Sequence, residues 1–357
     1  MARHFLLSKE ARNFSFDDVA RLSEDDVQAL FVKQRWGVHG EGVQVCPDCG
    51  SIDRHYVIRG RRQWRCKAMG CGRTFSVTSG TKFQDHKLPL KKIMQVLWLY
   101  VTGVKGVSAL EVSRRVDVAY QTAFTLLHKL REGLLDERNL EPLGRHVEID
   151  GGHFSGRIRK PRKKIKTTAM PARAKQGKTW YATHPNRRIV MVLREISPIQ
   201  GQGATRTIVE VVPAEAEVHV TPLALKYIKK GSVVHTDESN AFSRLGVRYE
   251  HFTVNHSVEF STDEGVNENQ AESFFARSRR LVWGAIHRMA PKYMLDYMNE
   301  IAWREDFRRK DTVKQVGLLL DAVLNNGRSR WWRGYWQGHH RPGELMFGQG
   351  AASKSSD

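Results

Sequence analysis

Cysteine is scarce in this chain and confined to one short segment. All four cysteines lie between Cys46 and Cys71, and the rest of the 357 residues contains none. A disulfide-stabilised secreted domain would distribute paired cysteines along its length, so that class of protein is excluded. Clustered thiols in an otherwise cysteine-free chain favour a reducing compartment and a metal site.

Long apolar runs are also missing. The longest strongly apolar stretch, Val96–Val101, is far shorter than the ~20 residues that a membrane-spanning helix requires. The first residues contain no hydrophobic segment followed by a cleavage site of small residues, so we expect no secretion signal. We therefore expect a cytoplasmic protein without a membrane partner.

Several common catalytic signatures are absent as well. The sequence contains no Rossmann fingerprint, no glycine-rich phosphate loop and no evident Ser-His-Asp arrangement. Three histidines, His153, His235 and His256, lack the spacing of a zinc hydrolase. From these absences we expect no nucleotide cofactor and neither serine nor zinc hydrolase chemistry.

Acidic residues are few relative to basic ones. The chain has 38 Asp and Glu against 58 Lys and Arg, which gives a formal charge of +20 and a pI near 10.0. Each Lys or Arg placed on a phosphate releases condensed counterions, so this surplus favours nucleic acid as a partner. Charge alone leaves open an ordinary basic protein. The hydrophobic content of 40% excludes a mainly disordered chain.

The four cysteines form two closely spaced pairs. Two residues separate Cys46 from Cys49, four separate Cys66 from Cys71, and 16 lie between the pairs. Two such pairs on tight turns provide the four tetrahedral thiolate ligands of Zn²⁺, whereas unrelated buried thiols would not be paired. The pattern predicts a zinc ribbon with one structural Zn²⁺, because four thiolates leave no coordination position open for chemistry.

Composition divides the chain into five stretches. We expect a helical lead-in at 1–44, the zinc ribbon at 45–80, a helix-rich segment at 88–136, an α/β domain at 145–330, and a partly disordered tail rich in Trp, Arg and Gly at 331–357.

The helix-rich segment is predicted to hold three helices, at Leu90–Thr102, Ser108–Val116 and Ala119–Arg131. The short break before the third helix is typical of a helix-turn-helix. One face of that helix offers polar side chains suited to bases and phosphates in the major groove of double-stranded DNA. This face consists of Tyr120, Gln121, Thr125, His128, Lys129 and Arg131. The alternative is a plain three-helix bundle with a solvated basic face.

From about residue 145, short β-branched runs alternate with helical patterns, which predicts a mixed α/β domain. The expected strands are 146–150, 188–196, 205–212 and 232–236, and the expected helices are 222–230, 269–282 and 291–309.

Three acidic residues occupy positions where such a domain presents functional groups. Asp150 and Asp237 are each predicted to end an apolar strand, and Glu272 follows on a helix, 35 residues beyond Asp237. Arg279 lies seven residues after Glu272, on the same helical face. Two Mg²⁺ ions roughly 4 Å apart stabilise the attacking and leaving oxygens of a phosphodiester displacement, and Mg²⁺ prefers oxygen ligands.

Each acid alone has an ordinary explanation. Asp150 precedes glycine as turn residues do, Asp237 fits a helix N-cap, and Glu272 fits a solvated helix position. The three together, on two strands and a following helix, are much more specific and predict a metal-binding triad.

Five motifs resemble the DDE transposases of bacterial insertion sequences, in particular the ISXO-two-like group related to Merlin elements. They are CPDCG at 46–50, VEIDGG at 147–152, HTDES at 235–239, NQAESFF at 269–275 and AWRED at 302–306. The resemblance implies a ribonuclease H-like fold with Asp150, Asp237 and Glu272 as ligands of two Mg²⁺, or of Mn²⁺ in their place. It also implies cleavage at element ends and attack of the freed 3′-hydroxyls on target DNA.

Two departures from that family pattern bear on the site. The cation after the third acid is Arg279 rather than the more usual Lys, which keeps the charge but changes its hydration and geometry. Some members use Asn as the third catalytic residue, and Asn269 lies one turn before Glu272. Glu272 is preferred because a carboxylate binds Mg²⁺ better than an amide does, with Asn269 as an alternative or additional ligand.

The segment from His153 to Arg194 contains 13 Lys and Arg and no Asp or Glu. Such a run is usually solvated and mobile. Directly after Asp150, it predicts an arm that contacts phosphates, with salt-dependent affinity and little sequence specificity.

The leading hypothesis is an active transposase that binds double-stranded DNA and works as a homo-oligomer, since transposition couples two element ends. Such a protein would be associated with the nucleoid. One rival is a transposase-derived zinc-ribbon regulator without catalysis, against which the intact carboxylate set argues. The other is a nuclease of the same fold that hydrolyses strands without joining them, which the sequence leaves open.

Overall fold

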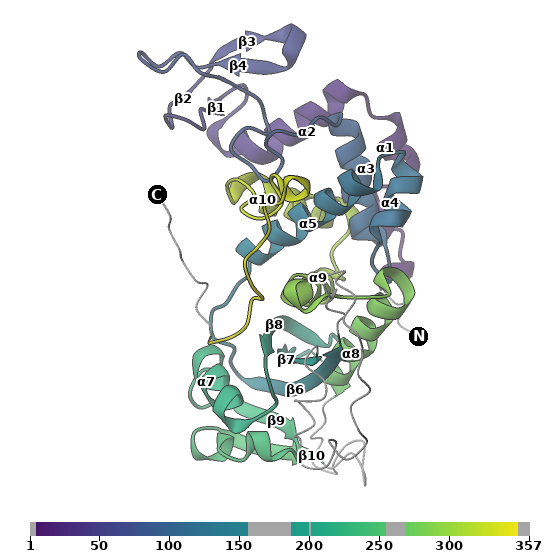
Figure 1. The fold of residues 1–357 in the computed structure, drawn as a ribbon, viewed down its shortest axis with the longest axis vertical. Coiled ribbons are helices and arrows are strands. Elements are labelled where there is room, and N and C mark those ends of the chain that lie inside the picture. Colours follow the sequence, from purple (N-terminus) through teal and green to yellow (C-terminus); the bar gives the residue numbers. More distant parts are fainter. Residues whose placement is uncertain (1–4, 156–186, 200, 255–268, 349–357) are drawn as a thin grey trace, which may run out of the picture. The chain divides into compact units, whose positions relative to one another are not determined.

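The computed structural model describes residues 5–155, 187–199, 201–254 and 269–348 (Figure 1). The chain forms two compact units. Unit 1 comprises Met1–Arg138 and Phe307–Arg341, and unit 2 comprises Asn139–Asp306 and Pro342–Asp357.

Unit 1 begins with two capped helices, α1 (Phe16–Arg21) and α2 (Glu24–Trp36). At the start of α2, Ser23 accepts a hydrogen bond from the Asp26 amide while the Asp26 carboxylate accepts one from the Ser23 amide. This capping box satisfies amides that would otherwise lack a partner at the helix N-terminus.

Five short strands follow α2 and form two small antiparallel sheets. They are β1 (Gln44–Val45), β2 (Ile52–Asp53), β3 (Tyr56–Ile58), β4 (Gln63–Arg65) and β5 (Thr74–Phe75). The aromatic side chains of Trp64 and Phe75 stack between β4 and β5, and Trp36 of α2 packs edge-on against both. Arg35 donates hydrogen bonds to the carbonyls of Val77 and Ser79, so α2 is joined to the strands by packing and by polar contacts.

The three helices predicted for residues 88–136 are present as α3 (Leu90–Thr102), α4 (Ala109–Val116) and α5 (Tyr120–Asp136). The turn between α4 and α5 contains Asp117 in the left-handed region, at φ 54°. Ser108 caps α4 by accepting a hydrogen bond from the Glu111 amide.

The polar face predicted for α5 is only partly exposed. Tyr120 and Gln121 face solvent, but His128 and Arg131 are 0% and 1% exposed, so their assignment to a DNA-contacting face was wrong. The cause is a contact distant in sequence: the Trp332 ring stacks on His128 with centroids 4.0 Å apart.

The C-terminal tail is more ordered than predicted, because residues 331–341 pack on α5. The Trp336 indole donates a hydrogen bond to Thr125 Oγ1 at 2.9 Å, and Tyr335 packs against Trp332. Residues 349–357 lie outside the described part of the chain.

The final helix α10 (Thr312–Asn325) also belongs to unit 1, where it packs against α2, α3 and α5. Unit 2 ends at Asp306 and includes the chain again only from Pro342 onward. The predicted α/β domain of 145–330 is therefore too long at its C-terminal end. The amphipathic pattern of α10 predicts a helix equally well in either unit, so sequence periodicity could not place the boundary.

Unit 2 is built on a five-stranded sheet in the order β10-β9-β6-β7-β8. Its strands are β6 (His146–Ser155), β7 (Arg187–Ile196), β8 (Ala204–Val212), β9 (Val233–Asp237) and β10 (Glu250–Val254). The pairs β6–β7 and β7–β8 are antiparallel, whereas β9 runs parallel to β6, and β10 runs parallel to β9. This order and these directions define a mixed ribonuclease H-like sheet, which confirms the expected fold class. The sequence analysis missed β10.

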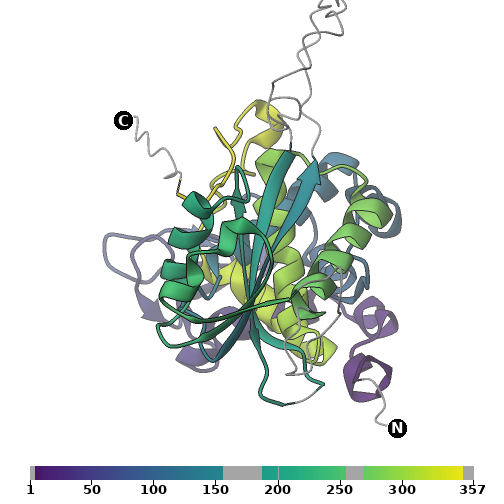
Figure 2. The ribbon, with the colours of Figure 1, turned by 90° about the horizontal axis from the view of Figure 1, so that it is seen from below.

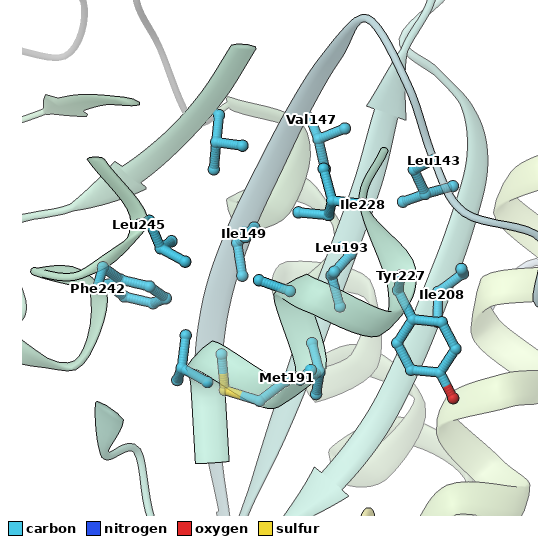
Figure 3. Packing of buried hydrophobic residues seen from close by; sticks show 14 of the residues in the cluster. Leu143, Val147, Ile149, Met191, Leu193, Ile208, Tyr227, Ile228, Phe242 and Leu245 are labelled. Carbon is cyan, nitrogen blue, oxygen red and sulfur yellow. The ribbon is translucent and has the colours of Figure 1, made fainter. Parts of the chain in front are cut away.

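Helices cover both faces of the sheet (Figure 2). On one face, α7 (Glu217–Tyr227) packs against alternate residues of β6 and β7, including Val147, Ile149, Met191 and Leu193 (Figure 3). The other face carries α8 (Asn269–Leu281), which packs on β6 and β7, and α9 (Met294–Phe307). Phe274 and Phe275 of α8 are both buried.

Within the described residues, every helix is too short or too polar to cross a lipid bilayer.

We expect Trp332→Ala to lower the free energy of unfolding of unit 1 by about 3–5 kcal/mol, because it leaves a cavity against α5. Trp332 is 2% exposed, whereas Trp283 is 71% exposed, so Trp283→Ala is a control expected to change stability by less than about 0.5 kcal/mol. Urea unfolding followed by circular dichroism measures both. Equal effects of the two substitutions would contradict the packing of the tail on α5.

Candidate functional site

The four cysteines converge on one point, as their spacing predicts. The Sγ atoms of Cys46 and Cys71 are 3.8 Å apart, those of Cys49 and Cys66 are 3.6 Å apart, and all four lie within 4.8 Å of one another. A tetrahedral Zn²⁺ with Zn–S bonds of about 2.3 Å separates its sulfurs by about 3.8 Å, so the cluster fits this ion.

The protonation chemistry of the cluster also fits a cation. Burial, with smaller contributions from the neighbouring thiols, raises the pKa of the Cys66 thiol to about 12. The thiolate therefore forms at neutral pH only when a positive charge compensates for its burial. The backbone amide of Ala68 donates to Cys66 Sγ at 3.4 Å, which supports a thiolate at this position.

Asp150 lies within β6 rather than at its end, so that part of the prediction was wrong. The strand continues through Gly151 and Gly152 to Ser155, paired throughout with β7. The parallel register with β9 extends from His146 to Glu148 and so ends before Asp150.

The two glycines that suggested a turn are required by close packing instead. A Cβ atom on Gly152 would lie 2.2 Å from the ring of Phe275, and one on Gly151 would lie 2.6 Å from the Glu215 carboxylate. Both approaches are closer than a real Cβ atom tolerates, so a side chain at Gly152 would clash with the Phe275 ring, and one at Gly151 would displace the Glu215 carboxylate.

Asp237 is the last residue of β9, as predicted. Glu148 pairs with His235 in register, so Asp150 and Asp237 each lie two residues beyond the last pair of these parallel strands. Because side chains two positions apart share a face, both acids project from the sheet face that Glu148 occupies. The backbone amide of Ser239 donates to Asp237 Oδ1 at 3.0 Å.

The predicted residues of α8 meet Asp150 at one pocket. Asp150, Glu272 and Arg279 all line a pocket of about 550 Å³, and both α8 side chains are exposed. Asp237, the other acid of the predicted triad, is not among the described residues that line this pocket.

The position of α8 on the sheet is set by a buried carboxylate of β6. Glu148, 2% exposed, accepts hydrogen bonds from the amides of Gln270 and Ala271 at 3.0 and 2.9 Å. These are amides of the first helical turn, which lack partners within the helix and carry its positive dipole end. Burial nevertheless raises the pKa of Glu148 to about 7, against the effect of these two hydrogen bonds.

A buried arginine extends this junction to α9. Arg194, 1% exposed, donates to the Gln270 carbonyl at 2.6 Å and lies 3.5 Å from Glu305 of α9. Arg277 of α8 also pairs with Glu305. The helix that carries Glu272 is thus connected to β6, β7 and α9 by charged groups.

Asp306, next to Glu305, connects α9 to β8. Its carboxylate accepts hydrogen bonds from the amide and the hydroxyl of Thr207, at 2.9 and 2.7 Å. Burial raises the pKa of Asp306 to about 7, and the opposing influence of Thr207 and Arg194 does not overcome it.

A carboxylate that the sequence analysis missed lies beside the predicted acids. Glu215, in the loop between β8 and α7, has a side chain that is 14% exposed and approaches His153 Nε2 to 3.6 Å. Burial raises the pKa of Glu215, and the charges of Asp237 and Asp150 raise it further. The sequence signal for this residue is weaker than that for Asp237, because Glu215 lies three residues after Val212, the end of β8, whereas Asp237 is itself the last residue of its strand.

Two predicted contributors cannot be placed. Asn269 is the first residue of α8, but its side chain lies outside what the structure describes. Most of the basic segment between His153 and Arg194 also lies outside the described residues.

The carboxylate site is open, in contrast to the thiol site. Among the described residues, the four cysteines are the one group of three or more metal-ligating side chains that already converges on a point. The carboxylates of Asp150, Asp237 and Glu272 offer the hard oxygen donors that suit Mg²⁺. This ion usually keeps several waters and binds through one or two carboxylates together with substrate phosphates.

Removal of zinc should unfold residues 45–80, because the binding free energy of a structural Zn²⁺, about 10–16 kcal/mol in small zinc modules, is part of the folding free energy. A strong chelator is expected to release one zinc per chain with loss of the ribbon structure. Elemental analysis combined with circular dichroism tests this, with Asp150→Asn as a control that keeps its zinc. Full ribbon structure and DNA binding after complete zinc removal would contradict the prediction.

The raised pKa of Asp306 predicts a pH dependence of stability. The folded state holds the Asp306 proton up to about pH 7, whereas the unfolded chain releases it near its ordinary value of 3.8. Because the folded state binds this proton more tightly, the proton stabilises the fold. The stabilisation is complete below pH 4 and is lost as the pH rises towards 7. Asp306→Asn should reduce the loss of unfolding free energy between pH 4 and 7 by about 1–4 kcal/mol.

Urea unfolding at several pH values measures this slope, with substitution of the exposed Glu250 by Gln as the control. A slope in Asp306→Asn equal to that of the parent protein would show that Asp306 is ionised in the folded state.

Two family models match the chain. The ISXO2-like transposase domain matches residues 142–306, and the transposase zinc-ribbon domain matches residues 22–74. The zinc-ribbon match begins before the predicted ribbon and includes α2, whose Trp36 and Arg35 pack on the strands.

Individual relatives are more distant. The protein described as "Uncharacterized protein in transposable element ISH50", from Halobacterium salinarum, is 25% identical over 319 residues, which are 85% of this chain and 98% of that protein. A chain from the crystal structure of the Mos1 strand transfer complex is 12% identical, with a TM-score of 0.23, and the match covers 69% of this chain and 82% of that one. A score this low carries no structural argument.

The two family matches together cover more than half of the chain, with the ribbon in unit 1 and the transposase domain in unit 2. The chain thus carries an ISXO2-like transposase domain together with a transposase zinc-ribbon domain, the two domains of an insertion-sequence transposase.

Proposed function

We propose that this chain is an active DNA transposase that cleaves the ends of an insertion element and joins the freed 3′-hydroxyls to target DNA. The observation that carries the proposal is the meeting of Asp150, Glu272 and Arg279 at one pocket of a ribonuclease H-like transposase domain. Hydrolysis and strand transfer are both in-line displacements at phosphorus, so one such site serves both steps.

In this proposal the three acids hold the divalent ions. Asp150 and Asp237 project from adjacent strands on the same sheet face, and Glu272 approaches from α8. Bound Mg²⁺ would lower the pKa of the attacking water or hydroxyl and stabilise the leaving oxygen. Asn269 remains an additional candidate ligand.

Arg279 is assigned to the DNA backbone. It lies two turns after Glu272 on the pocket-lining face of α8 and is exposed. A guanidinium there would bind a phosphate oxygen near the scissile bond and orient the strand.

Unit 1 is proposed to bind element-end DNA. The zinc ribbon exposes basic side chains next to the exposed Tyr56 and Val57, and α4 exposes Arg114 and Arg115 just before α5. The ribbon residues concerned are Arg54, Arg59, Arg61 and Arg65. Of the face predicted for α5, Tyr120 and Gln121 at its N-terminus remain available for base contacts.

The working form is proposed to be a homo-oligomer that brings two element ends together, in the cytoplasm and at the nucleoid. The regulator and nuclease hypotheses share the DNA-binding surfaces, so only the chemistry of the carboxylate site distinguishes them.

Strand transfer is the test. The full chain is incubated with Mg²⁺, a plasmid target and its flanking element-end DNA carrying a pre-cut 3′-hydroxyl. Joined products are expected from the parent protein, and loss of metal binding should reduce them at least about 1,000-fold in Asp150→Asn and Asp237→Asn. Glu250→Gln, on β10, is the control expected to remain active.

The alternatives give different products. Specific end binding without joining in the parent protein would favour the regulator, and nicking without joining would favour the nuclease.

A further inference from the structure

Glu215 is a carboxylate for which the proposed triad has no use, although it lies between two of the triad positions. It follows β8 in the loop before α7, whereas Asp150 and Asp237 belong to β6 and β9. Three chain segments distant in sequence thus bring acids to one end of the sheet.

The contact on the β6 side is close. A Cβ atom on Gly151 would lie 2.6 Å from Glu215 Oε2 and 2.9 Å from its Cδ, so the carboxylate lies directly over the Gly151 backbone. The Gly151 amide in turn donates to Asp150 Oδ1 at 2.6 Å. One glycine therefore contacts both carboxylates.

The contact on the β9 side passes through Ser239. The Ser239 hydroxyl is hydrogen-bonded to Glu215, while its backbone amide donates to Asp237 Oδ1 at 3.0 Å. Glu215 is thus joined to Asp150 through Gly151 and to Asp237 through Ser239.

Like charges gather at this end of the sheet. The carboxylates of Asp237 and Asp150 act electrostatically on Glu215, and Arg187 opposes them only in part. His153 Nε2 lies 3.6 Å from Glu215 Oε2. A divalent cation bound between the carboxylates would remove their repulsion, and the fourth carboxylate would increase the affinity for the ion.

We propose that Glu215 is a fourth carboxylate ligand of the active-site metal, binding the ion that Asp150 and Asp237 share. The proposal rests on the proposed two-metal site and adds to it a residue that the triad does not contain. Gly151 has a specific part in this arrangement, because only the absence of a side chain there leaves room for the Glu215 carboxylate beside Asp150.

Mn²⁺ binding by the zinc-loaded full chain tests the proposal without relying on activity. The electron paramagnetic resonance signal of free Mn²⁺ reports how much ion the protein binds. We expect Glu215→Gln to weaken binding about 10- to 100-fold, since it removes the charge and keeps the shape. Glu217→Gln, two residues further on and paired with Arg244 at 2.8 Å, is the matched control expected to bind like the parent protein.

A second set of variants leaves all the acids in place. Gly151→Ala should displace the Glu215 carboxylate and weaken Mn²⁺ binding to a similar extent. In a Glu215→Ala background, where nothing remains to displace, adding Gly151→Ala should cause little further loss. This comparison also decides the question if Glu215→Gln proves poorly folded.

Asp150→Asn in the same titration separates the two proposals. If Asp150→Asn loses Mn²⁺ affinity while Glu215→Gln binds like the parent protein, the fourth-ligand proposal is overturned and the triad stands. If Asp150→Asn also binds like the parent, the two-metal site itself is wrong and Glu215 has no metal to bind.

Discussion

The hydrogen bonds between Glu148 and the first turn of α8 are the junction on which the catalytic face of unit 2 depends. They join the strand of Asp150 to the helix of Glu272, two elements more than a hundred residues apart in sequence. Burying a carboxylate is costly, and helix amides with Arg194 nearby provide the compensation that makes it tolerable. Because Glu148 is two residues from Asp150 on the same strand face, any movement of α8 would be transmitted directly to the pocket. The AWRED motif has a physical explanation in this setting, since Glu305 and Asp306 hold Arg194 and β8 in place.

The thiol cluster and the proposed carboxylate metal site differ in how far the protein completes them. The thiol cluster is closed, buried and already convergent, as a structural ion requires. The carboxylates surround an open pocket and leave coordination positions to water and phosphate. This difference matches their proposed tasks, because a folding ligand must remain bound, whereas a catalytic ion must exchange water for substrate. It also places the soft and hard donors in separate units, so that neither ion competes well for the other site.

The features predicted correctly from sequence are those encoded locally. The cysteine ligands follow from spacing alone, α3 to α5 from helical periodicity, and Asp237 from its position at the end of an apolar run. The errors concern partners distant in sequence. Gly151 and Gly152 suggested a turn, but both pair with β7 within an extended strand, and Phe275 and Glu215 occupy the space where side chains would lie. His128 and Arg131 fitted an exposed face, but Trp332 stacks on His128, and Arg131 is buried over the Tyr100 ring of α3. Periodicity describes one helix at a time, so it could not reveal that residues two hundred positions later would pack on α5.

Unit 1 is assembled from both ends of the chain, with unit 2 inserted between Arg138 and Phe307. The helices α2, α3 and α5 are synthesised first, yet they obtain α10 and Trp332 only after the whole of unit 2 has been translated. A chain interrupted between α5 and α10 would carry the zinc ribbon and α5 with an uncovered apolar surface, which favours aggregation or proteolysis over stable folding. If unit 1 binds element ends as proposed, such fragments would make poor competitors for them. The order of synthesis thereby couples the stability of unit 1 to the presence of a complete unit 2 in the same molecule.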